Sequence, residues 1–303
     1  MKLVQYYENW VETYKKGAVR DVTLRKYKMD IVHLRNIAPG LECEELTRPE
    51  YQKIINVFAE THEKITVLDF HHRLKAAVMD AVDDGLVPAD PTRRVVVKGK
   101  QPSEKKIKYL NRFELESMLR KLELGDTPSY EWLILLVAKT GMRFSEALAI
   151  TPADFDFKKQ TLSITKTWDY KNGGGFAPTK NASSVRKIKI DWQTAMQFSQ
   201  MCTGLPQDAP IFVKEGINVY NSTVNDILAR KCEEADVPVI AIHGLRHTHA
   251  SILLSAGVSI ASVAQRLGHS NMTTTQKVYL HIIKELEDKD TGMIMSTLTG
   301  LGG

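Results

Sequence analysis

The sequence feature that most constrains this chain is a short region in its last third that collects chemically active side chains. Residues 243–251 read His-Gly-Leu-Arg-His-Thr-His-Ala-Ser, and Leu-Gly-His-Ser at 267–270 and Tyr279 follow. Gly257 and Gly268 are expected to break the helices of this region. Arginine and histidine together suit an oxyanion such as phosphate, and a phenol beside them could attack it. We therefore interpret the region as a candidate phosphoryl-transfer site with Tyr279 as nucleophile.

Length and composition bound the class of protein. The chain has 303 residues, which predicts about two domains. Its 43% hydrophobic and 25% charged residues are typical of a soluble globular protein. A net charge of +5 permits nucleic acid as a partner without requiring it, so the distribution of charge matters more than the sum.

Cysteine usage and hydropathy bear on the location of the protein. Cys43, Cys202 and Cys232 are scattered and form no CxxC pair, which favours a reducing cytoplasm. The N-terminus lacks the basic start and apolar stretch of a signal peptide. The longest apolar run, residues 132–138, is too short to span a bilayer. We therefore expect a cytoplasmic protein that does not bind membranes.

Hydrophobic periodicity predicts an all-helical first part. Apolar residues recur at helical spacing in four segments, which are residues 4–16, a segment opened by Asp21 or Thr23, a segment opened by Thr47 with Pro49 just inside, and residues 66–83. Gly85, Pro88 and Pro91 then stop the last helix. The sequence therefore predicts a helical domain over residues 1–92.

A basic segment follows the predicted helical domain. Residues 93–108 hold one acidic and seven basic residues, namely Arg93, Arg94, Lys98, Lys100, Lys105, Lys106 and Lys108. Two interpretations are open: a solvated linker between two domains, or a tether that closes a clamp around a polyanion such as DNA.

The remaining part, residues 109–303, is predicted to be mostly helical. Asn111 and Glu114 form a capping-box pattern, and an apolar helix over 131–139 stops at Gly141. Residues 155–168 and 185–192 are predicted strands, with a glycine-rich turn at 171–175 between them.

Several residues of this part could carry chemistry. Arg143 follows the stop at Gly141 and precedes a helix that Ser145 could cap, so its guanidinium would project from a rigid junction. Glu146 could orient it, although a surface ion pair is the simpler explanation. Lys180 is predicted at the tip of a hairpin, where an ordinary exposed lysine is equally expected.

The histidines of residues 243–269 divide into candidate catalytic and structural groups. His243 and Arg246 are three residues apart and share a helix face, and His269 follows Gly268 at the start of a new segment. His247 and His249 are expected to be structural. No HExxH, cysteine pair or nearby carboxylate supports a zinc site, so no metal is predicted.

Together these residues resemble the tyrosine recombinase family, which includes the phage integrases and the Xer-type resolvases. The resemblance rests on the order Arg143, Lys180, His243-x-x-Arg246, His269 and Tyr279, and on the letters Thr-Gly-Met-Arg-Phe-Ser-Glu-Ala-Leu, His-Gly-Leu-Arg-His-Thr-His-Ala-Ser and Leu-Gly-His-Ser. It covers the second part of the chain almost completely, and the first part looks like the core-DNA-binding domain of the family.

The resemblance implies a fold and a domain plan. The fold is mainly α with a small antiparallel β-sheet in the C-terminal domain. A SAM-like four-helix core-binding domain would occupy residues 1–92, a basic linker 93–108, and a catalytic domain with a C-terminal tail 109–303. Many phage integrases carry a further domain that binds arm-type DNA sites. This chain begins directly at the helical part, as in a simple two-domain recombinase or a trimmed one.

The resemblance also implies a mechanism. Tyr279 would attack the DNA backbone and form a 3′-phosphotyrosyl bond with release of a 5′-hydroxyl. The other implied roles are stabilisation of the phosphate oxygens by Arg143, Arg246 and His269, general acid catalysis by Lys180, proton exchange with the tyrosine by His243, and support by Glu146. Because the covalent bond keeps the phosphoester energy, no metal, ATP or other cofactor is expected.

The expected partner is double-stranded DNA at core recombination sites, bound by a homo-tetramer that exchanges C-terminal segments. A directionality factor or a host DNA-bending protein is a further candidate partner. The tail residues 293–298 could dock on a neighbour or fold back. Integration or excision of a phage or other mobile element is the expected role, and Xer-type chromosome resolution, a type IB topoisomerase and a non-catalytic DNA-binding relative are the alternatives.

Overall fold

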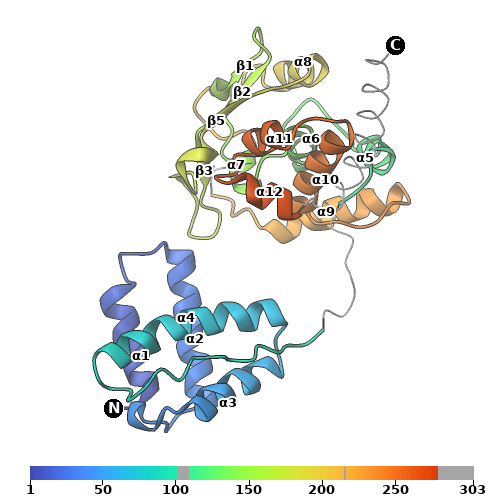
Figure 1. Cartoon of the computed structure of the whole chain (residues 1–303). Helices are drawn as coiled ribbons and strands as arrows, with labels where there is room; N and C mark the ends of the chain where they lie inside the picture. The colour runs from blue at the N-terminus through green and yellow to red at the C-terminus, as the bar shows by residue number, and fades with distance from the viewer. Residues whose placement is uncertain (102–108, 215, 279–303) are drawn as a thin grey trace, which may run out of the picture. The chain divides into compact units, whose positions relative to one another are not determined.

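The structure is a computed structural model, and it describes residues 1–101, 109–214 and 216–278. The chain divides into two compact units, Met1–Lys105 and Lys106–Gly303 (Figure 1). Each unit has a hydrophobic core of its own. The predicted fold class, mainly helical with a small antiparallel sheet in the second part, is confirmed.

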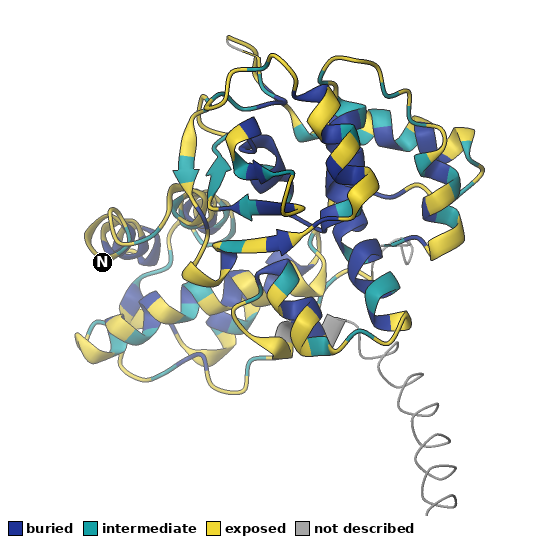
Figure 2. Cartoon of the chain, turned by 90° about the horizontal axis from the view of Figure 1, so that it is seen from above, coloured by how far each residue is buried: buried dark blue, intermediate teal, exposed yellow. Residues whose placement is uncertain are grey.

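Four α-helices build the described part of the first unit: α1 (Leu3–Tyr14), α2 (Asp21–Ile37), α3 (Arg48–Ala59) and α4 (Lys64–Asp83). A 3₁₀ turn, η1 (Cys43–Glu45), precedes α3. The predicted cap of α3 is present, because the Thr47 hydroxyl accepts from the Glu50 N–H and Pro49 lies in the first turn. Each helix has one buried face (Figure 2), and Tyr7, Tyr51, Phe70 and Leu74 are fully buried.

The basic segment begins as part of this first unit. Val95 and Val97 pack against its core. The Gln52 amide of α3 binds both backbone groups of Val96, accepting from its N–H at 2.9 Å and donating to its carbonyl at 2.9 Å. The backbone N–H of Lys100 donates to the carbonyl of His62 at 2.9 Å. Because core packing and backbone hydrogen bonds hold it, this stretch extends the first unit beyond the predicted boundary at residue 92.

The second unit is organised around one buried helix. The described helices are α5 (Arg112–Leu119), α6 (Tyr130–Thr140), α7 (Phe144–Leu148), α8 (Trp192–Met201), α9 (Asn221–Glu234), α10 (Ile242–Ser255), α11 (Ile260–Leu267) and α12 (Met272–Val278). Residues 132–138 of α6 are all buried, and α6 contacts α7, α9 and α10. A helix that is apolar on every side must be surrounded in this way. The predicted capping box of Asn111 and Glu114 opens α5.

Five short strands form two antiparallel sheets in the second unit. They are β1 (Phe155–Asp156), β2 (Thr161–Ile164), β3 (Lys166–Trp168), β4 (Phe176–Pro178) and β5 (Arg186–Lys189), arranged as β1-β2-β5 and β3-β4. Ile164 of β2 pairs with Arg186 of β5, and Trp168 of β3 with Phe176 of β4. The two predicted strands were therefore too long. The first is divided into three, β4 was not predicted, and α8 begins at Trp192 after its cap Asp191.

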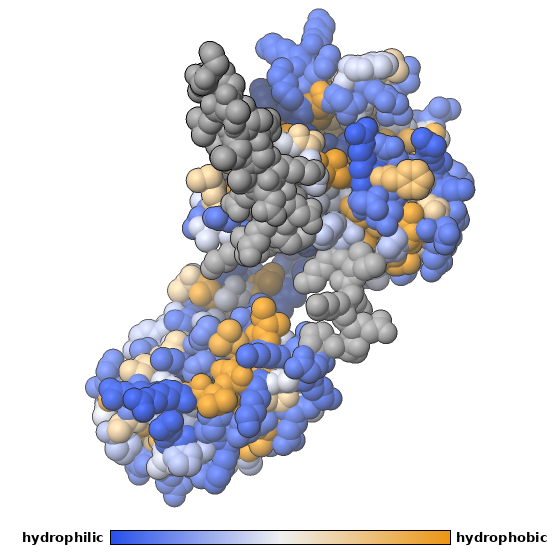
Figure 3. Space-filling model, turned by 45° about the vertical axis from the view of Figure 1, so that its right-hand side comes forward, coloured by the Kyte–Doolittle hydropathy of each residue, from blue (hydrophilic) through white to orange (hydrophobic). Residues whose placement is uncertain are grey.

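On the face drawn in Figure 3 the first unit is mostly hydrophilic, and an apolar patch interrupts this surface. Its helices expose several large apolar side chains, namely Tyr14, Val22, Met29, Val32, Val57, Ile65 and Leu68. Among the described residues, no helix is long and apolar enough to cross a membrane.

Candidate active site

The site begins at the junction between α6 and α7. Gly141 ends α6 with a left-handed φ of 67°, which a glycine adopts without steric cost. The chain then turns, and Arg143 is the N-cap of α7. The predicted cap by Ser145 is wrong, because the carboxylate of Glu146 accepts the Arg143 N–H at 2.9 Å. The predicted placement of the Arg143 side chain at a junction between two helices is confirmed.

Glu146 is enclosed between two arginines. Its side chain is 1% exposed, and its Oε1 accepts from Arg143 Nη1 at 2.6 Å while its Oε2 accepts from Arg186 Nη2 at 3.0 Å. Burial raises the pKa of this carboxyl, but the positive charges and hydrogen bonds of Arg186 and Arg143 outweigh burial and lower the pKa below its ordinary value. Glu146 is therefore an ionised, buried support for Arg143 and not a surface partner.

Arg246 is the buried guanidinium of the site. It lies in the first turns of α10, is 3% exposed, and donates to the carbonyls of Gly141 and Leu267 at 2.7 Å each. Arg143 donates to the next carbonyl, that of Gly268, at 3.2 Å. The two arginines therefore bind consecutive carbonyls at the end of α11, although they lie about a hundred residues apart in the sequence.

His269 lies on the same turn. Gly268 ends α11 with a φ of 69°, and the Nδ1 of His269 is 2.7 Å from the hydroxyl of the buried Thr275 in α12. Burial and the positive charges of Arg246, Arg143 and Arg186 lower the pKa of His269 to about 4. Its ring is therefore neutral at pH 7 and lies in a strongly positive environment.

His243 is the second residue of α10, which also carries Arg246. Partial burial and the positive charges of Arg246 and Arg143 lower its pKa. Its ring lies edge-to-face with that of His247, with 4.9 Å between centroids. The structure thus brings Arg143, Glu146, His243, Arg246 and His269 together, as the sequence predicted.

Lys180 occupies a different place from the predicted one. The tip of the β3–β4 hairpin is formed by residues 169–175, where the Gly174 N–H donates to the Asp169 carbonyl. Lys180 follows β4, at the base of the hairpin, and its side chain is exposed. The 3₁₀ turn η3 (Ala182–Ser184) comes next, and its Ser184 hydroxyl accepts from Arg143 Nη1 at 3.3 Å. The segment that carries Lys180 therefore leads directly into the arginine cluster.

Tyr279 lies outside the described residues. The last described residue of α12 is Val278, so Tyr279 follows directly in the sequence. The tail residues 293–298 also lie outside the described part of the chain.

Two residues that complete the cluster, Arg186 and Arg266, were not predicted from the sequence. Arg186 binds Glu146, and Arg266 donates to the Nε2 of His249 at 2.9 Å. The Nδ1 of His249 donates in turn to the carbonyl of Ala138 at 3.0 Å. His249 was expected to be structural, and its two hydrogen bonds join Ala138 of α6 to Arg266 of α11. No local sequence pattern predicts the roles of Arg186 and Arg266, because their partners, Glu146 and His249, come from distant segments.

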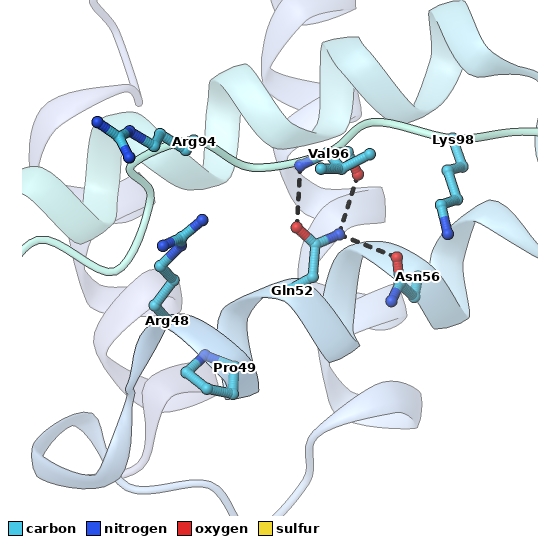
Figure 4. A pocket seen from close by; sticks show the side chains of 7 residues that line it. All are labelled: Arg48, Pro49, Gln52, Asn56, Arg94, Val96 and Lys98. Carbon is cyan, nitrogen blue, oxygen red and sulfur yellow. Dashed lines mark hydrogen bonds between the residues drawn. The ribbon is translucent and has the colours of Figure 1, made fainter.

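The basic segment forms part of a separate pocket in the first unit. Arg94 and Lys98 line a cavity of about 410 Å³ together with Arg48 and Asn56 of α3 (Figure 4). Gln52 lies in the middle and holds the segment at Val96. Of the other predicted cations, Arg93 is exposed beside Asp90 at 3.5 Å and Lys100 is exposed, whereas Lys105, Lys106 and Lys108 lie outside the described residues.

Comparison with known proteins places the chain in a family. Residues 108–285 match the phage integrase family, which is more than half of the chain. The chain therefore belongs to this family and is an enzyme of the tyrosine recombinase class.

Individual relatives agree with that assignment. The integrase of Staphylococcus phage L54a is 26% identical over 313 residues, which cover 92% of this chain and 88% of the phage protein. The tyrosine recombinase XerC of Bacillus subtilis is 30% identical over 190 residues, which cover 60% of each protein.

Two solved structures have a similar fold. An integrase of the transposon Tn1549, in complex with a circular intermediate DNA, matches with a TM-score of 0.77 at 19% identity over 91% of this chain and 94% of its own. A lambda integrase tetramer bound to a Holliday junction matches with a TM-score of 0.65 at 15% identity over 90% and 79%. At these identities the matches establish the fold.

Proposed function

We propose that this chain is a site-specific DNA recombinase that cleaves and rejoins strands through Tyr279. The observation that carries the proposal is the convergence of Arg143, Arg246 and His269 on the turn that ends α11. Such a cluster suits the phosphorus that is attacked in strand cleavage, because its oxygens gain negative charge in the transition state.

The proposed reaction is a phosphoryl transfer. The hydroxyl oxygen of Tyr279 attacks a backbone phosphorus, the bond from phosphorus to the 5′-oxygen breaks, and a 3′-phosphotyrosyl bond forms. His243 takes the proton of the phenol, and Lys180 gives a proton to the leaving 5′-oxygen. A 5′-hydroxyl of another strand reverses these steps, so that resealing uses the stored phosphoester energy without ATP and without a metal.

The charges of the cluster support these roles. Burial first, and then the positive charges of Arg246 and Arg143, lower the pKa values of His243 and His269, and those same positive charges would attract a phosphodiester. Arg143 and Arg246 would bind its non-bridging oxygens, and the neutral ring of His269 would donate one further hydrogen bond. Loss of any one of these donors is expected to slow cleavage by about 10²–10³-fold.

DNA binding by the basic pocket belongs to the same proposal. Arg48, Arg94 and Lys98 surround one cavity, and a duplex backbone supplies phosphates that would neutralise them. We assign the exposed cations Arg93 and Lys100 of the same segment, and Lys105, Lys106 and Lys108 beyond it, to the same binding role.

Integration or excision of a phage or another mobile element is the proposed biological role. The similarity to the phage L54a integrase over most of both chains, and the fold shared with a transposon integrase, favour it over Xer-type chromosome resolution. The proposed active form is a homo-tetramer on two core sites, assisted by a directionality factor or a host DNA-bending protein.

The nucleophile is tested by trapping it. The full chain is incubated with a random-sequence duplex library that contains nicks, so that cleavage near a nick releases the 5′-hydroxyl strand and leaves the adduct. We expect a covalent adduct on a denaturing gel with the unaltered chain and with Tyr220→Phe, in which an exposed tyrosine is changed. Tyr279→Phe should bind DNA and form none. An adduct from Tyr279→Phe would refute the assignment, and sequencing the trapped strands would identify the target site.

A further inference from the structure

Arg186 of β5 joins three segments of the second unit through one guanidinium. Its Nη2 donates to the Glu146 carboxylate at 3.0 Å, its Nη1 to the Ser184 carbonyl at 2.8 Å, and its Nε to the Arg266 carbonyl at 2.7 Å. The side chain is 5% exposed. A planar group with all three nitrogens bound in different directions has little freedom to move.

Each residue that accepts a hydrogen bond from Arg186 either contacts a proposed catalytic side chain or lies next to residues that do. Glu146 and Ser184 both accept from Arg143, at 2.6 Å and 3.3 Å. The Arg266 carbonyl immediately precedes the two carbonyls, of Leu267 and Gly268, that accept from Arg246 and Arg143. Arg186 therefore fixes the strand, the helix junction and the turn against which the cluster is assembled.

We propose that Arg186 is a positioning residue for strand cleavage, which holds Arg143, Arg246 and His269 in the relative positions that cleavage requires. This inference rests on the proposed function, because it assigns Arg186 a part in that reaction without contact to the DNA. No part of the sequence pattern of residues 243–279 or of the Arg143 motif assigned this role.

The fit around Arg186 supports a fixed geometry. A Cβ added at Gly268 would lie 2.9 Å from Arg186 Nη1 and 3.0 Å from the Ser183 carbonyl. The turn that carries His269 therefore lies directly on the guanidinium and leaves no room for another side chain. A displacement of about 1 Å in such a site can cost on the order of 10²-fold in rate.

Charge gives the proposal a signature that simple packing would lack. The charge of Arg186 is the largest of the influences that lower the pKa of Glu146 against its burial. Without it the pKa of this buried carboxyl rises, so Glu146 becomes protonated as the pH falls and releases its ion pair with Arg143. Cleavage should then decline at acidic pH.

The variants separate charge from geometry. Arg186→Gln removes both, whereas Arg186→Lys keeps a positive charge beside Glu146 but cannot reach all three acceptors. Lys187→Gln is the matched control, because it removes the same charge from the next residue of β5, where the side chain is exposed. Glu146→Gln combined with Arg186→Gln removes the titrating carboxyl, and it also avoids leaving a buried unpaired charge that could prevent folding.

The first measurement is the single-turnover rate of adduct formation between about pH 5.5 and 9, on a nicked duplex with the target sequence found in the trapping experiment. Arg186→Gln should lose about 10²-fold in rate with DNA affinity unchanged, and its acid-side decline should move to higher pH. Arg186→Lys should regain the unaltered acid-side profile but remain slow, the double variant should show no such shift, and Lys187→Gln should behave as the unaltered chain. If Arg186→Gln and Arg186→Lys lost the same factor in cleavage rate at every pH, Arg186 would be only a packing residue, and the proposal would be overturned.

A second measurement does not depend on cleavage. Inorganic phosphate is titrated while the ring resonances of His269 are followed by NMR, and the apparent dissociation constant is compared among the variants. We expect phosphate to bind the unaltered chain and Lys187→Gln alike and Arg186→Gln at least about tenfold more weakly, a difference of about 1.4 kcal/mol. Equal affinities would overturn the inference even if cleavage were seen. If Arg186→Gln bound phosphate more weakly but the unaltered chain formed no adduct, the result would count against the proposed function alone.

Discussion

At the scale of single residues, His249 shows how a histidine of the motif can join distant segments through both of its ring nitrogens. Arg266 donates to its Nε2, so the proton must reside on Nδ1, which donates to Ala138. Burial and the nearby Arg266 charge lower its pKa to about 4. His249 therefore joins α6, α10 and α11 only while its ring is neutral.

The first prediction concerns the pH dependence of stability. A histidine whose pKa is lower in the folded than in the unfolded chain contributes stability above its unfolded pKa, and this contribution is lost as the pH falls towards the folded pKa. The stability advantage of the unaltered chain over His249→Phe should therefore shrink by roughly 2 kcal/mol between about pH 7 and pH 5. Urea unfolding followed by circular dichroism measures it at each pH.

The control for this prediction is His72→Phe, which changes an exposed histidine of the first unit. The pH-dependent change should be larger for His249→Phe than for His72→Phe. A change no larger than that of the control would mean that the His249 ring is not held neutral by Arg266 and Ala138.

The sequence predicted the residues of the cluster better than their supports. Arg143 and Arg246 stand in motifs whose neighbouring residues are informative, so both could be proposed as site residues from the sequence alone. Arg186 stands among basic residues of a short strand, and nothing near it indicates a partner forty residues upstream. The role of Arg186 depends on long-range packing, which residue spacing does not report.

At the scale of elements, helix ends were predictable and strand ends were not. Side-chain caps at Thr47 and Asn111, and the glycine stop after α6, act over a few residues and are visible in the letters. The turn of the β3–β4 hairpin was predicted, but strand β4 was not, because it has only three residues and ends in a proline. With so few residues no alternation of apolar and polar positions can be recognised.

The second of these predictions concerns the stop after α6. Gly141→Ala should destabilise the chain for two reasons: its φ is 67°, and the added Cβ would lie 2.7 Å from the ring of His249 and 2.9 Å from Leu267. The matched control is Gly257→Ala, which has a φ of 84° but open space around the added Cβ. Strain alone should cost about 1–2 kcal/mol in both variants, and crowding should add about 1–3 kcal/mol at residue 141 only.

Cleavage should separate these two glycine variants further. The carbonyl of Gly141 accepts from Arg246 at 2.7 Å, so a shift of the α6–α7 junction moves that guanidinium, whereas Gly257 binds none of the catalytic groups among the described residues. Urea unfolding and single-turnover cleavage measure the two effects. Equal stability and equal rates of the two variants would contradict the packing of α6 against α10 and α11 described above.

At the scale of the whole molecule, the structure has two compact units, whereas the sequence predicted two domains and a separate linker. The cluster of arginines and histidines belongs entirely to the second unit, and the basic pocket belongs to the first. The linker was predicted from the charge of residues 93–108. In the structure, the apolar side chains of Val95 and Val97 pack its first half against the core of the first unit. The charge of this segment suggested its proposed role in DNA binding, whereas its packing depends on α3, a separate part of the sequence.

The last prediction follows from this division. If phosphates bind in the pocket, replacing Arg48, Arg94 and Lys98 together by glutamine should weaken DNA binding at every sequence alike, and should reduce the slope of log K against log salt by about 0.9 for each phosphate that is no longer neutralised. Lys53→Gln is the control, because Lys53 lies on the same helix but is already paired with Glu50 at 2.6 Å. Fluorescence anisotropy of a labelled duplex at several salt concentrations measures both quantities. Since Gln52 and the cores remain intact, folding should be unaffected, and an unchanged slope in the triple variant would show that the pocket does not neutralise the DNA backbone.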